Sequence, residues 1–369
     1  MSIPFIDLKP QYQALKTEID ERIHRVLEHG QFIMGPEVRE CEENLKKFIG
    51  SRHAIACSNG TIALQMALMA MGVGPGDEVI TTAFSFIATA EVLLLVGATP
   101  VYVDIDPETY NIDIKKIEPA ITAKTKAILP VSLYGQPSDM DEINAIAKKH
   151  KLFVIEDAAQ SFGAPYKTRR SCNLSEIGCT SFFPAKPLGC YGDGGAVFTN
   201  DDALAEKLLS IRIHGMGTHR YQHPRVGLNG RLDSIQCAVI STKLSRYPWE
   251  LERRNFIATK YTQAFSELSG HGVRTPKIAP DRGSVWAQYT LWVADRAKFQ
   301  AKLQEKSIPT AVHYPMAMCD QDAYKTTGRV LDIKTARLAA EHVVSLPMYP
   351  DMTTEIQDQV IEAVRCVYL

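Results

Sequence analysis

Apolar positions along the first part of the chain follow two alternating periodicities. Near the N-terminus they recur at helical spacing and predict helices over residues 12–27 and 36–50, each with a glycine at its end. Short apolar runs that favour strands then alternate with helical segments. This alternation predicts an α/β fold in which helices cover both faces of a mainly parallel sheet. The predicted strands lie at residues 53–57, 78–82, 99–104, 126–133 and 152–155.

The second half of the chain combines a long helix with fewer strands. Pro248 lies within the long helix and predicts a kink or a break there. Thr354 and Gln357 form a capping box that starts the last helix. We divide the chain into a large domain, residues 1–245, and a small C-terminal α/β domain, residues 246–369. The predicted elements are strands near Phe182 and at 196–199, 289–294 and 311–314, and helices at 235–268, 297–306, 335–344 and 354–367.

Composition and charge narrow the class of protein. Lys and Arg number 41 and Asp and Glu number 42, so no overall positive field attracts nucleic acid or an anionic membrane. The first residues lack the apolar segment of a secretory signal. The longest apolar run, residues 92–96, is too short to cross a bilayer. We therefore expect a cytoplasmic protein with neither a nucleic-acid nor a membrane partner.

A metal site is not expected. The eight cysteines include no pair at the short spacing that is typical of zinc ligands. His214, His219 and His223 stand close together, but no acidic residue or cysteine accompanies them in the segment 214–225. Because that segment also carries arginines and a tyrosine, a solvated surface loop or a loop near a substrate diphosphate explains it better.

A strand-to-helix turn at residues 57–61 (CSNGT) is a candidate anion site. The backbone N–H groups that begin a helix have no partner within the helix, and the helix dipole favours negative charge there. Gly60 allows an anion to approach the backbone closely, and Thr61 adds a hydroxyl. A tight turn without a ligand explains the same residues nearly as well. The chain has no Walker-type phosphate loop.

Two charged residues stand at positions where a charge needs a partner. Asp157 ends an apolar strand, at the edge of the sheet where open α/β folds bind ligands. An isolated buried carboxylate is costly, so either a basic side chain or a ligand cation must balance Asp157. Lys186 lies in an apolar, glycine-rich segment, where burial would lower its pKa and leave an amine able to form a Schiff base. Taken alone, Lys186 is better explained as an ordinary lysine on a turn.

The three features together meet the needs of one cofactor. Pyridoxal 5'-phosphate needs an amine for its aldehyde, an acid beside its pyridine nitrogen and an anion site for its phosphate. Lys186, Asp157 and the turn at Gly60 and Thr61 supply these groups. The chain also resembles, almost from end to end, the DegT/DnrJ/StrS sugar aminotransferases, which are fold-type-I enzymes with this cofactor. The segments that carry the resemblance are 5–8 (FIDL), 35–38 (GPEV), 59–61 (NGT), 84–89 (FSFIAT), 156–164 (EDAAQSFGA), 181–195 (SFFPAKPLGCYGDGG) and 313–315 (HYP).

The resemblance implies roles for residues around the cofactor ring. Lys186 would bind the cofactor aldehyde and then move the proton between the two carbon positions. Asp157 would form a salt bridge with the pyridinium nitrogen, and Gln160 would contact the ring hydroxyl. Phe86 would stack on the ring, with a place in the apolar core as the alternative.

The resemblance also implies how the cofactor phosphate is bound. Ser181 would contact it together with Gly60 and Thr61. Asn229 would reach it from the neighbouring subunit. The resemblance therefore implies a homodimer with shared active sites, in keeping with the prevalence of two-fold symmetric assemblies.

Within the family, one subgroup is particularly similar to this chain. It comprises the UDP-2-acetamido-2-deoxy-3-oxo-glucuronate aminotransferases of O-antigen and lipopolysaccharide biosynthesis, which implies a nucleotide-sugar substrate and L-glutamate as the amino donor. Arg231, His313 and Tyr314 are candidates to contact the sugar, its carboxylate or the diphosphate. Packing under the small domain is the alternative for His313 and Tyr314. The most similar segments are 8–12, 131–136 and 180–191.

Departures from the family pattern keep other substrates open. Thr168 and Asn173 stand where glycine is common, and residues 316–319 (MAMC) replace the usual continuation near the expected sugar pocket. An aminotransferase for a UDP- or dTDP-4-keto-6-deoxy sugar therefore stays as an alternative. A sugar dehydratase that uses the amino form of the cofactor would have histidine in place of Lys186. A catalytically silent regulator would have no need for the complete cofactor site.

Overall fold

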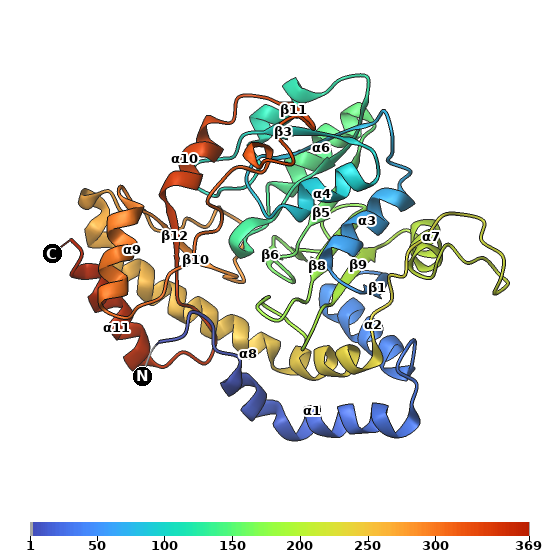
Figure 1. The fold of residues 1–369 in the computed structure, drawn as a ribbon, viewed down its shortest axis with the longest axis horizontal. Helices are drawn as coiled ribbons and strands as arrows, with labels where there is room; N and C mark the ends of the chain where they lie inside the picture. The colour runs from blue at the N-terminus through green and yellow to red at the C-terminus, as the bar shows by residue number, and fades with distance from the viewer. Residues whose placement is uncertain (1–2, 369) are drawn as a thin grey trace.

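An eight-stranded sheet forms the centre of the computed structural model, which describes residues 3–368 (Figure 1). Its spatial order is β1-β9-β8-β5-β4-β2-β3-β11. Neighbours from β8 to β11 are parallel, whereas β9 runs antiparallel to both β1 and β8. The predicted mainly parallel α/β sheet is confirmed. The strands are β1 (His53–Cys57), β2 (Glu78–Thr82), β3 (Thr99–Val103), β4 (Thr125–Leu129), β5 (Phe153–Asp157), β8 (Ile177–Ser181), β9 (Gly195–Thr199) and β11 (Arg329–Val330).

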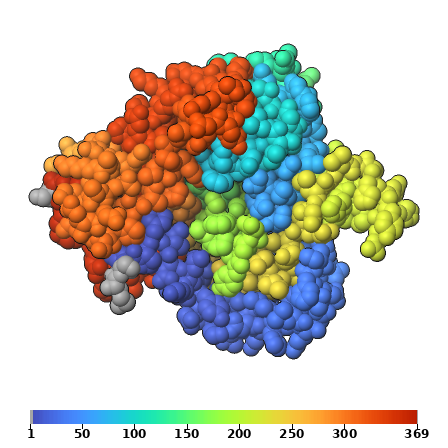
Figure 2. All heavy atoms as spheres, in the orientation of Figure 1, coloured from blue at the N-terminus to red at the C-terminus, as the bar shows by residue number. Residues whose placement is uncertain are grey.

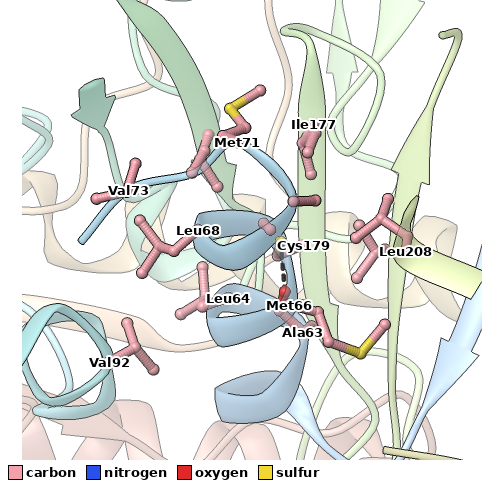
Figure 3. Close-up of a cluster of buried hydrophobic side chains, with 14 of the residues drawn as sticks. Ala63, Leu64, Met66, Leu68, Met71, Val73, Val92, Ile177, Cys179 and Leu208 are labelled. Carbon is pink, nitrogen blue, oxygen red and sulfur yellow. Dashed lines mark hydrogen bonds between the residues drawn. The ribbon is translucent and has the colours of Figure 1, made fainter. Parts of the chain in front are cut away.

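Helices cover both faces of this sheet because its strands are apolar on both sides. Val79 and Ile155 pack with α3, α4 and α7, the cluster that Figure 3 shows around α3. Their neighbours Ile80 and Val154 belong to a cluster on the opposite face. Alternate strand residues point to opposite faces, so burial on both sides requires the near-continuous apolar runs seen in the sequence. The covering helices are α3 (Gly60–Ala70), α4 (Ala88–Leu95) and α7 (Asp202–Arg212) on one face, and α1 (Lys9–His29), α2 (Pro36–Ile49), α5 (Ile114–Ile117) and α6 (Met140–His150) on the other.

The long helix α8 (Ser234–Phe265) connects this sheet to a C-terminal part of the molecule (Figure 1). Pro248 lies inside α8, which continues through it instead of ending there. The division at residues 245 and 246 falls within α8 and stays a prediction. The two residues of β11 return from the C-terminal part to pair with β3. The C-terminal elements are β10 (Tyr289–Trp292), α9 (Arg296–Glu305), α10 (Lys334–His342), β12 (Val343–Leu346) and α11 (Thr354–Arg365).

Three details of the C-terminal part differ from the prediction. The predicted strand at 311–314 is wrong, because only Ala311 pairs with a neighbour, through a single bridge to Ser345. The predicted helix at 335–344 ends at His342, and the β-branched residues that follow form β12, antiparallel to β10. Among residues 3–368 no helix is long and apolar enough to span a membrane.

The third difference is the start of α11. Thr353, one residue before the predicted cap, accepts a hydrogen bond from the Ile356 backbone N–H at 3.3 Å. Gln357 is buried and donates instead to the Ile257 carbonyl of α8 at 2.7 Å. The predicted capping box therefore does not form, because the Gln357 side chain bonds to α8 and not to the start of its own helix.

Replacing Thr353 with alanine should lower the free energy of unfolding by about 1 kcal/mol, since the first turn of α11 loses its side-chain acceptor. Thr354→Ala is the matched control and should change it by less than about 0.5 kcal/mol, because that position lies inside the helix. Urea denaturation followed by circular dichroism measures both values. A larger loss in Thr354→Ala would contradict the observed start of the helix.

Candidate active site

A cavity of about 540 Å³ opens at the carboxyl ends of the strands, where the sheet meets the C-terminal part. Open α/β folds bind ligands at this edge because successive strand-to-helix loops gather there. Residues far apart in the sequence meet in the cavity, and nine of the eleven predicted site residues line it. They are Gly60, Thr61, Phe86, Asp157, Gln160, Ser181, Lys186, His313 and Tyr314.

Asp157 is the last residue of β5, with its side chain facing the cavity and only 4% of the residue exposed. Its carboxyl oxygens accept hydrogen bonds from the Thr89 hydroxyl at 2.8 Å and the Ala159 backbone N–H at 3.1 Å. Burial raises the pKa of the Asp157 carboxyl, which the two hydrogen bonds and the charge of Lys186 oppose. In the part of the chain that the structure describes, no basic side chain forms an ion pair with Asp157. The arrangement therefore fits a cationic ligand atom and not a structural salt bridge.

Lys186 lies in the loop between β8 and β9 and faces the same cavity as Asp157. Its backbone N–H donates to the Phe183 carbonyl at 2.6 Å and closes a tight turn. Burial lowers the pKa of the Lys186 amine, and the negative charge of Asp157 opposes this shift. The amine is therefore easier to deprotonate than that of an exposed lysine, as a Schiff-base lysine requires.

The predicted anion site is formed where α3 begins against the end of β8. The Asn59 side chain caps α3 by accepting from the Ile62 backbone N–H at 2.8 Å, which leaves the N–H groups of Gly60 and Thr61 for a ligand. A Cβ atom at Gly60 would lie 2.7 Å from the Cβ of Ser181, too close for any side chain. The glycine thus lets the helix N-terminus and the Ser181 hydroxyl share one end of the cavity. This cradle fits a phosphate.

Gln160 is held in one orientation by hydrogen bonds at both ends of its amide. Its oxygen accepts from the Tyr134 backbone N–H at 2.9 Å, and its nitrogen donates to the Tyr314 hydroxyl at 3.0 Å. One amide N–H remains to contact a ligand hydroxyl. Phe86 is 54% exposed with its ring 6.2 Å from that of Tyr314, so it lines the cavity and does not belong to the apolar core.

His313 and Tyr314 form the wall of the cavity that the C-terminal part contributes. The Nδ1 atom of His313 forms a hydrogen bond with the Ser345 hydroxyl at 2.9 Å. Burial, helped by the charge of Lys186, lowers the pKa of His313 to about 4. Burial also raises the pKa of the Tyr314 phenol. Both groups are therefore neutral near pH 7 and can form hydrogen bonds without adding charge.

Asn229 and Arg231 lie outside this cavity. They line a second hollow of about 410 Å³, and Asp193 borders both. Asn229 is exposed and accepts a hydrogen bond from the Arg231 guanidinium. The Gly230 carbonyl accepts from the Ser58 N–H at 3.0 Å, next to the anion site. Neither Asn229 nor Arg231 thus lines the cavity of its own chain.

The segment with the three histidines projects from the body of the protein after α7 (Figure 2). Tyr221 within this segment is 86% exposed. The His223 Nδ1 atom forms a hydrogen bond with the His214 carbonyl at 2.9 Å. Within residues 3–368 no three histidine, cysteine or acidic side chains are grouped as metal ligands would be.

The sequence analysis missed two residues of the site. Thr89, which orients Asp157, lies in the first turn of α4 and is the last residue of the segment 84–89 that carries the family resemblance, so that motif could have revealed it. Gln288 lines the cavity just before β10, and its buried amide oxygen has no hydrogen-bond partner among the described residues. No local signal marks Gln288, because only the tertiary fold brings β10 to the cavity.

Comparison with known proteins agrees with this geometry. A relative from Pseudomonas aeruginosa, "UDP-2-acetamido-2-deoxy-3-oxo-D-glucuronate aminotransferase", is 53% identical over 95% of this chain and 96% of its own. "Pleiotropic regulatory protein" of Geobacillus stearothermophilus is 45% identical over 100% of this chain and 99% of its own. The crystal structure of DesV from Streptomyces venezuelae, in complex with a ketimine intermediate, is 37% identical with a TM-score of 0.96, covering 100% of this chain and 99% of that one.

The family assignment rests on a match over nearly the whole chain. Residues 13–365 match the model of the DegT/DnrJ/EryC1/StrS aminotransferase family. The buried acid, the cavity-facing lysine and the phosphate cradle are the groups that pyridoxal 5'-phosphate needs. The chain belongs to the DegT/DnrJ/EryC1/StrS family of pyridoxal 5'-phosphate-dependent aminotransferases.

Proposed function

We propose that the chain transfers the amino group of L-glutamate to the ketone of UDP-2-acetamido-2-deoxy-3-oxo-glucuronate, in the cytoplasm, for O-antigen or lipopolysaccharide biosynthesis. The observation that carries the proposal is that Lys186, Asp157 and the anion cradle at Gly60 face one cavity. The similarity to the Pseudomonas aeruginosa relative over nearly the whole chain supports this substrate.

The cofactor-binding residues account for the first half of the reaction. When bound, pyridoxal 5'-phosphate supplies the electron sink that makes loss of a proton beside the amino nitrogen feasible. Asp157 would hold the protonated ring nitrogen, and Ser181 and Thr61 would hold the phosphate. Lys186 would bind the aldehyde and, as a free amine, accept the proton from one carbon and return it to the other. The lowered pKa of Lys186 favours the neutral form that accepts a proton.

We further propose that the site is completed by a second copy of the chain. Asn229 would contact the cofactor phosphate of the partner, and Arg231 would bind the sugar carboxylate or the diphosphate. Phe32, Ile33 and Met34 support this arrangement, because they are exposed apolar side chains next to the hollow that holds Arg231. A large exposed apolar patch is typical of an interaction surface.

The sugar would lie against the wall formed by the C-terminal part. Tyr314 keeps its phenol proton and can donate a hydrogen bond to a sugar oxygen. His313 is neutral and can bond a hydroxyl or amide group without repelling a cation. The proposed sugar contacts are limited to His313 and Tyr314. Residues 316–319, which follow them, depart from the family pattern.

Three other functions remain as alternatives. A UDP- or dTDP-4-keto-6-deoxy sugar would use the same cofactor site and differ only in sugar contacts. Lys186 argues against a dehydratase, which would have histidine there. The relative named as a regulatory protein allows a silent regulator. Retention of Lys186, Asp157, Gln160 and Ser181 around one cavity argues against it.

The substrate is tested with a panel of UDP- and dTDP-linked keto sugars, each incubated with L-glutamate. We expect 2-oxoglutarate to form with UDP-2-acetamido-2-deoxy-3-oxo-glucuronate. His313 and Tyr314 can bond its acetamido and hydroxyl groups, and Arg231 of the second copy would bind its carboxylate or the diphosphate. Mass spectrometry of the amino sugar and a coupled assay for 2-oxoglutarate measure the two products. Reaction with 4-keto-6-deoxy sugars alone would reject the proposed substrate.

Replacing Lys186 with alanine should lower kcat by at least about 10²–10⁴-fold, the usual contribution of one acid–base group. The purified wild-type protein should be yellow, and borohydride should fix the cofactor to the peptide that contains Lys186. Exposed Lys124 provides the control, since Lys124→Ala should keep both colour and turnover. A fixed label on any other lysine would show that the site is assigned wrongly.

His313 should make the fold sensitive to acid. Its pKa is about 4 in the folded protein against 6.5 in the unfolded chain, so its stabilising effect is complete above pH 6.5 and is lost as the pH falls towards 4. From pH 7 to pH 5 the residue should cost up to about 2 kcal/mol of the free energy of unfolding.

Urea denaturation at the two pH values measures this cost. His313→Asn should reduce the drop in stability between them, whatever it does to stability at pH 7. The control, His24→Asn, alters a histidine whose side chain is 73% exposed and should leave the drop unchanged. An equal drop in His313→Asn and the wild type would show that His313 does not titrate as expected.

A further inference from the structure

Lys243 of α8 is a buried lysine that has no part in the proposed reaction. It is 1% exposed, and its Nζ atom donates to the Gly189 carbonyl at 2.7 Å. The same atom lies 4.3 Å from the centre of the Tyr191 ring, close enough for a cation–π interaction. Burial lowers the pKa of Lys243 to about 8. Lysine is seldom buried, so this arrangement needs an explanation.

Lys243 contacts Gly189 at the end of the loop that carries Lys186, and Tyr191 two residues further along. We define the lysine loop as residues 183–189. A Cβ atom at Gly189 would lie 2.5 Å from the Pro184 carbonyl oxygen, so the two ends of the loop are in direct contact. At its base, the Cys190 backbone N–H donates to the Phe182 carbonyl at 2.8 Å. The hydrogen bond from Lys243 to the Gly189 carbonyl therefore restrains the whole lysine loop.

The charge of Lys243 is balanced from its own helix. Glu250 lies seven positions further along α8, is 1% exposed, and favours the charged form of Lys243. The Glu250 carboxylate accepts hydrogen bonds from the Gln11 amide of α1 at 2.8 Å and the Arg246 guanidinium at 3.4 Å. The remaining group that shifts the pKa of Lys243 is the Cys190 thiol. Among the described residues Glu250 forms its ion pair with Arg246 and not with Lys243. An ammonium that is buried without a carboxylate in contact is an expensive way to stabilise a fold, which points to a positional role.

We propose that Lys243 is a positioning residue for Lys186. It fixes the lysine loop against α8 and so keeps the Lys186 amine inside the cavity, opposite Asp157. The proposal rests on the role of Lys186 in the proposed function. Without Lys243, the Gly189 carbonyl loses its donor, the lysine loop loosens and water reaches Lys186. Asp157 and His313 face Lys186 whether or not Lys243 is present, so the main change on its removal is greater hydration of Lys186. Because water stabilises the charged amine, the pKa of Lys186 should rise.

Lys243→Met tests the proposal, because it keeps the length of the side chain and removes the charge and the donor. The first measurement is the pH dependence of Lys186 acylation in the cofactor-free chain, followed by mass spectrometry of its peptide. We expect the midpoint to rise by about one pH unit, a tenfold change in the proton equilibrium. The visible absorption band of the cofactor-loaded protein should titrate at a correspondingly higher pH.

Kinetics provide a second measurement. Misplacement of Lys186 should lower kcat by about tenfold or more, while KM for the keto sugar changes by less than about twofold. Lys243→Arg keeps a charge and N–H donors and should restore most of the acylation midpoint. Lys260→Met is the matched control on the same helix, because Lys260 pairs with Asp358 at 2.6 Å and contacts no part of the lysine loop.

A folded Lys243→Met protein with the wild-type acylation midpoint would overturn the proposal, as would an equal shift in Lys260→Met. If Lys243→Met does not fold, Tyr191→Leu carries the test, since it removes only the ring beneath the ammonium and should raise the midpoint in the same direction by a smaller amount. Acylation is measured without substrate. Failure of the proposed substrate and failure of the positioning role are therefore separate results.

Discussion

The site depends on a buried carboxyl with which no basic side chain among residues 3–368 forms an ion pair. Asp157 ends β5 at the cavity, held by Thr89 and the Ala159 N–H. Burial of an unpaired charge costs several kcal/mol, so the protein shifts the pKa of Asp157 upwards or binds a cation there. Lys186 faces the same cavity with its own pKa lowered by burial. A cofactor with a basic ring nitrogen and an aldehyde offsets the cost of burying both side chains, since its nitrogen pairs with Asp157 and its aldehyde binds Lys186.

The parallel sheet makes this arrangement possible. Its strands end at one edge, so the turn at Gly60, the end of β5 and the end of β8 meet although more than a hundred residues separate the first from the last. Close packing of Gly60 against Ser181 brings the start of α3 to the end of the cavity. The apolar cluster around α3 fixes the helix axis, and thus the direction of its free N–H groups (Figure 3).

Helix α8 links the two halves of the site. Its first half contacts the lysine loop through Lys243, and Arg254 further along donates to the Trp286 carbonyl at 3.0 Å, just before Gln288 and β10. The lysine side of the cavity and the wall from the C-terminal part are therefore positioned by one continuous element. The charges of Lys243, Glu250 and Arg254 follow a single buried stripe of this helix, where their contacts with loops and neighbouring helices replace apolar packing.

The sequence by itself determined the sheet and the cofactor, and it indicated the residues that we propose to bind that cofactor. Each of these depends on local patterns: apolar periodicity, a strand-to-helix turn, and short motifs around Asp157 and Lys186. Only the tertiary structure decided how distant segments combine. It placed Gln288 at the cavity, drew Gln357 away from the predicted cap to Ile257, and set Lys243 beneath the lysine loop. The two hydrogen bonds join residues 54 and 100 positions apart, and periodicity carries no information on pairing at that range.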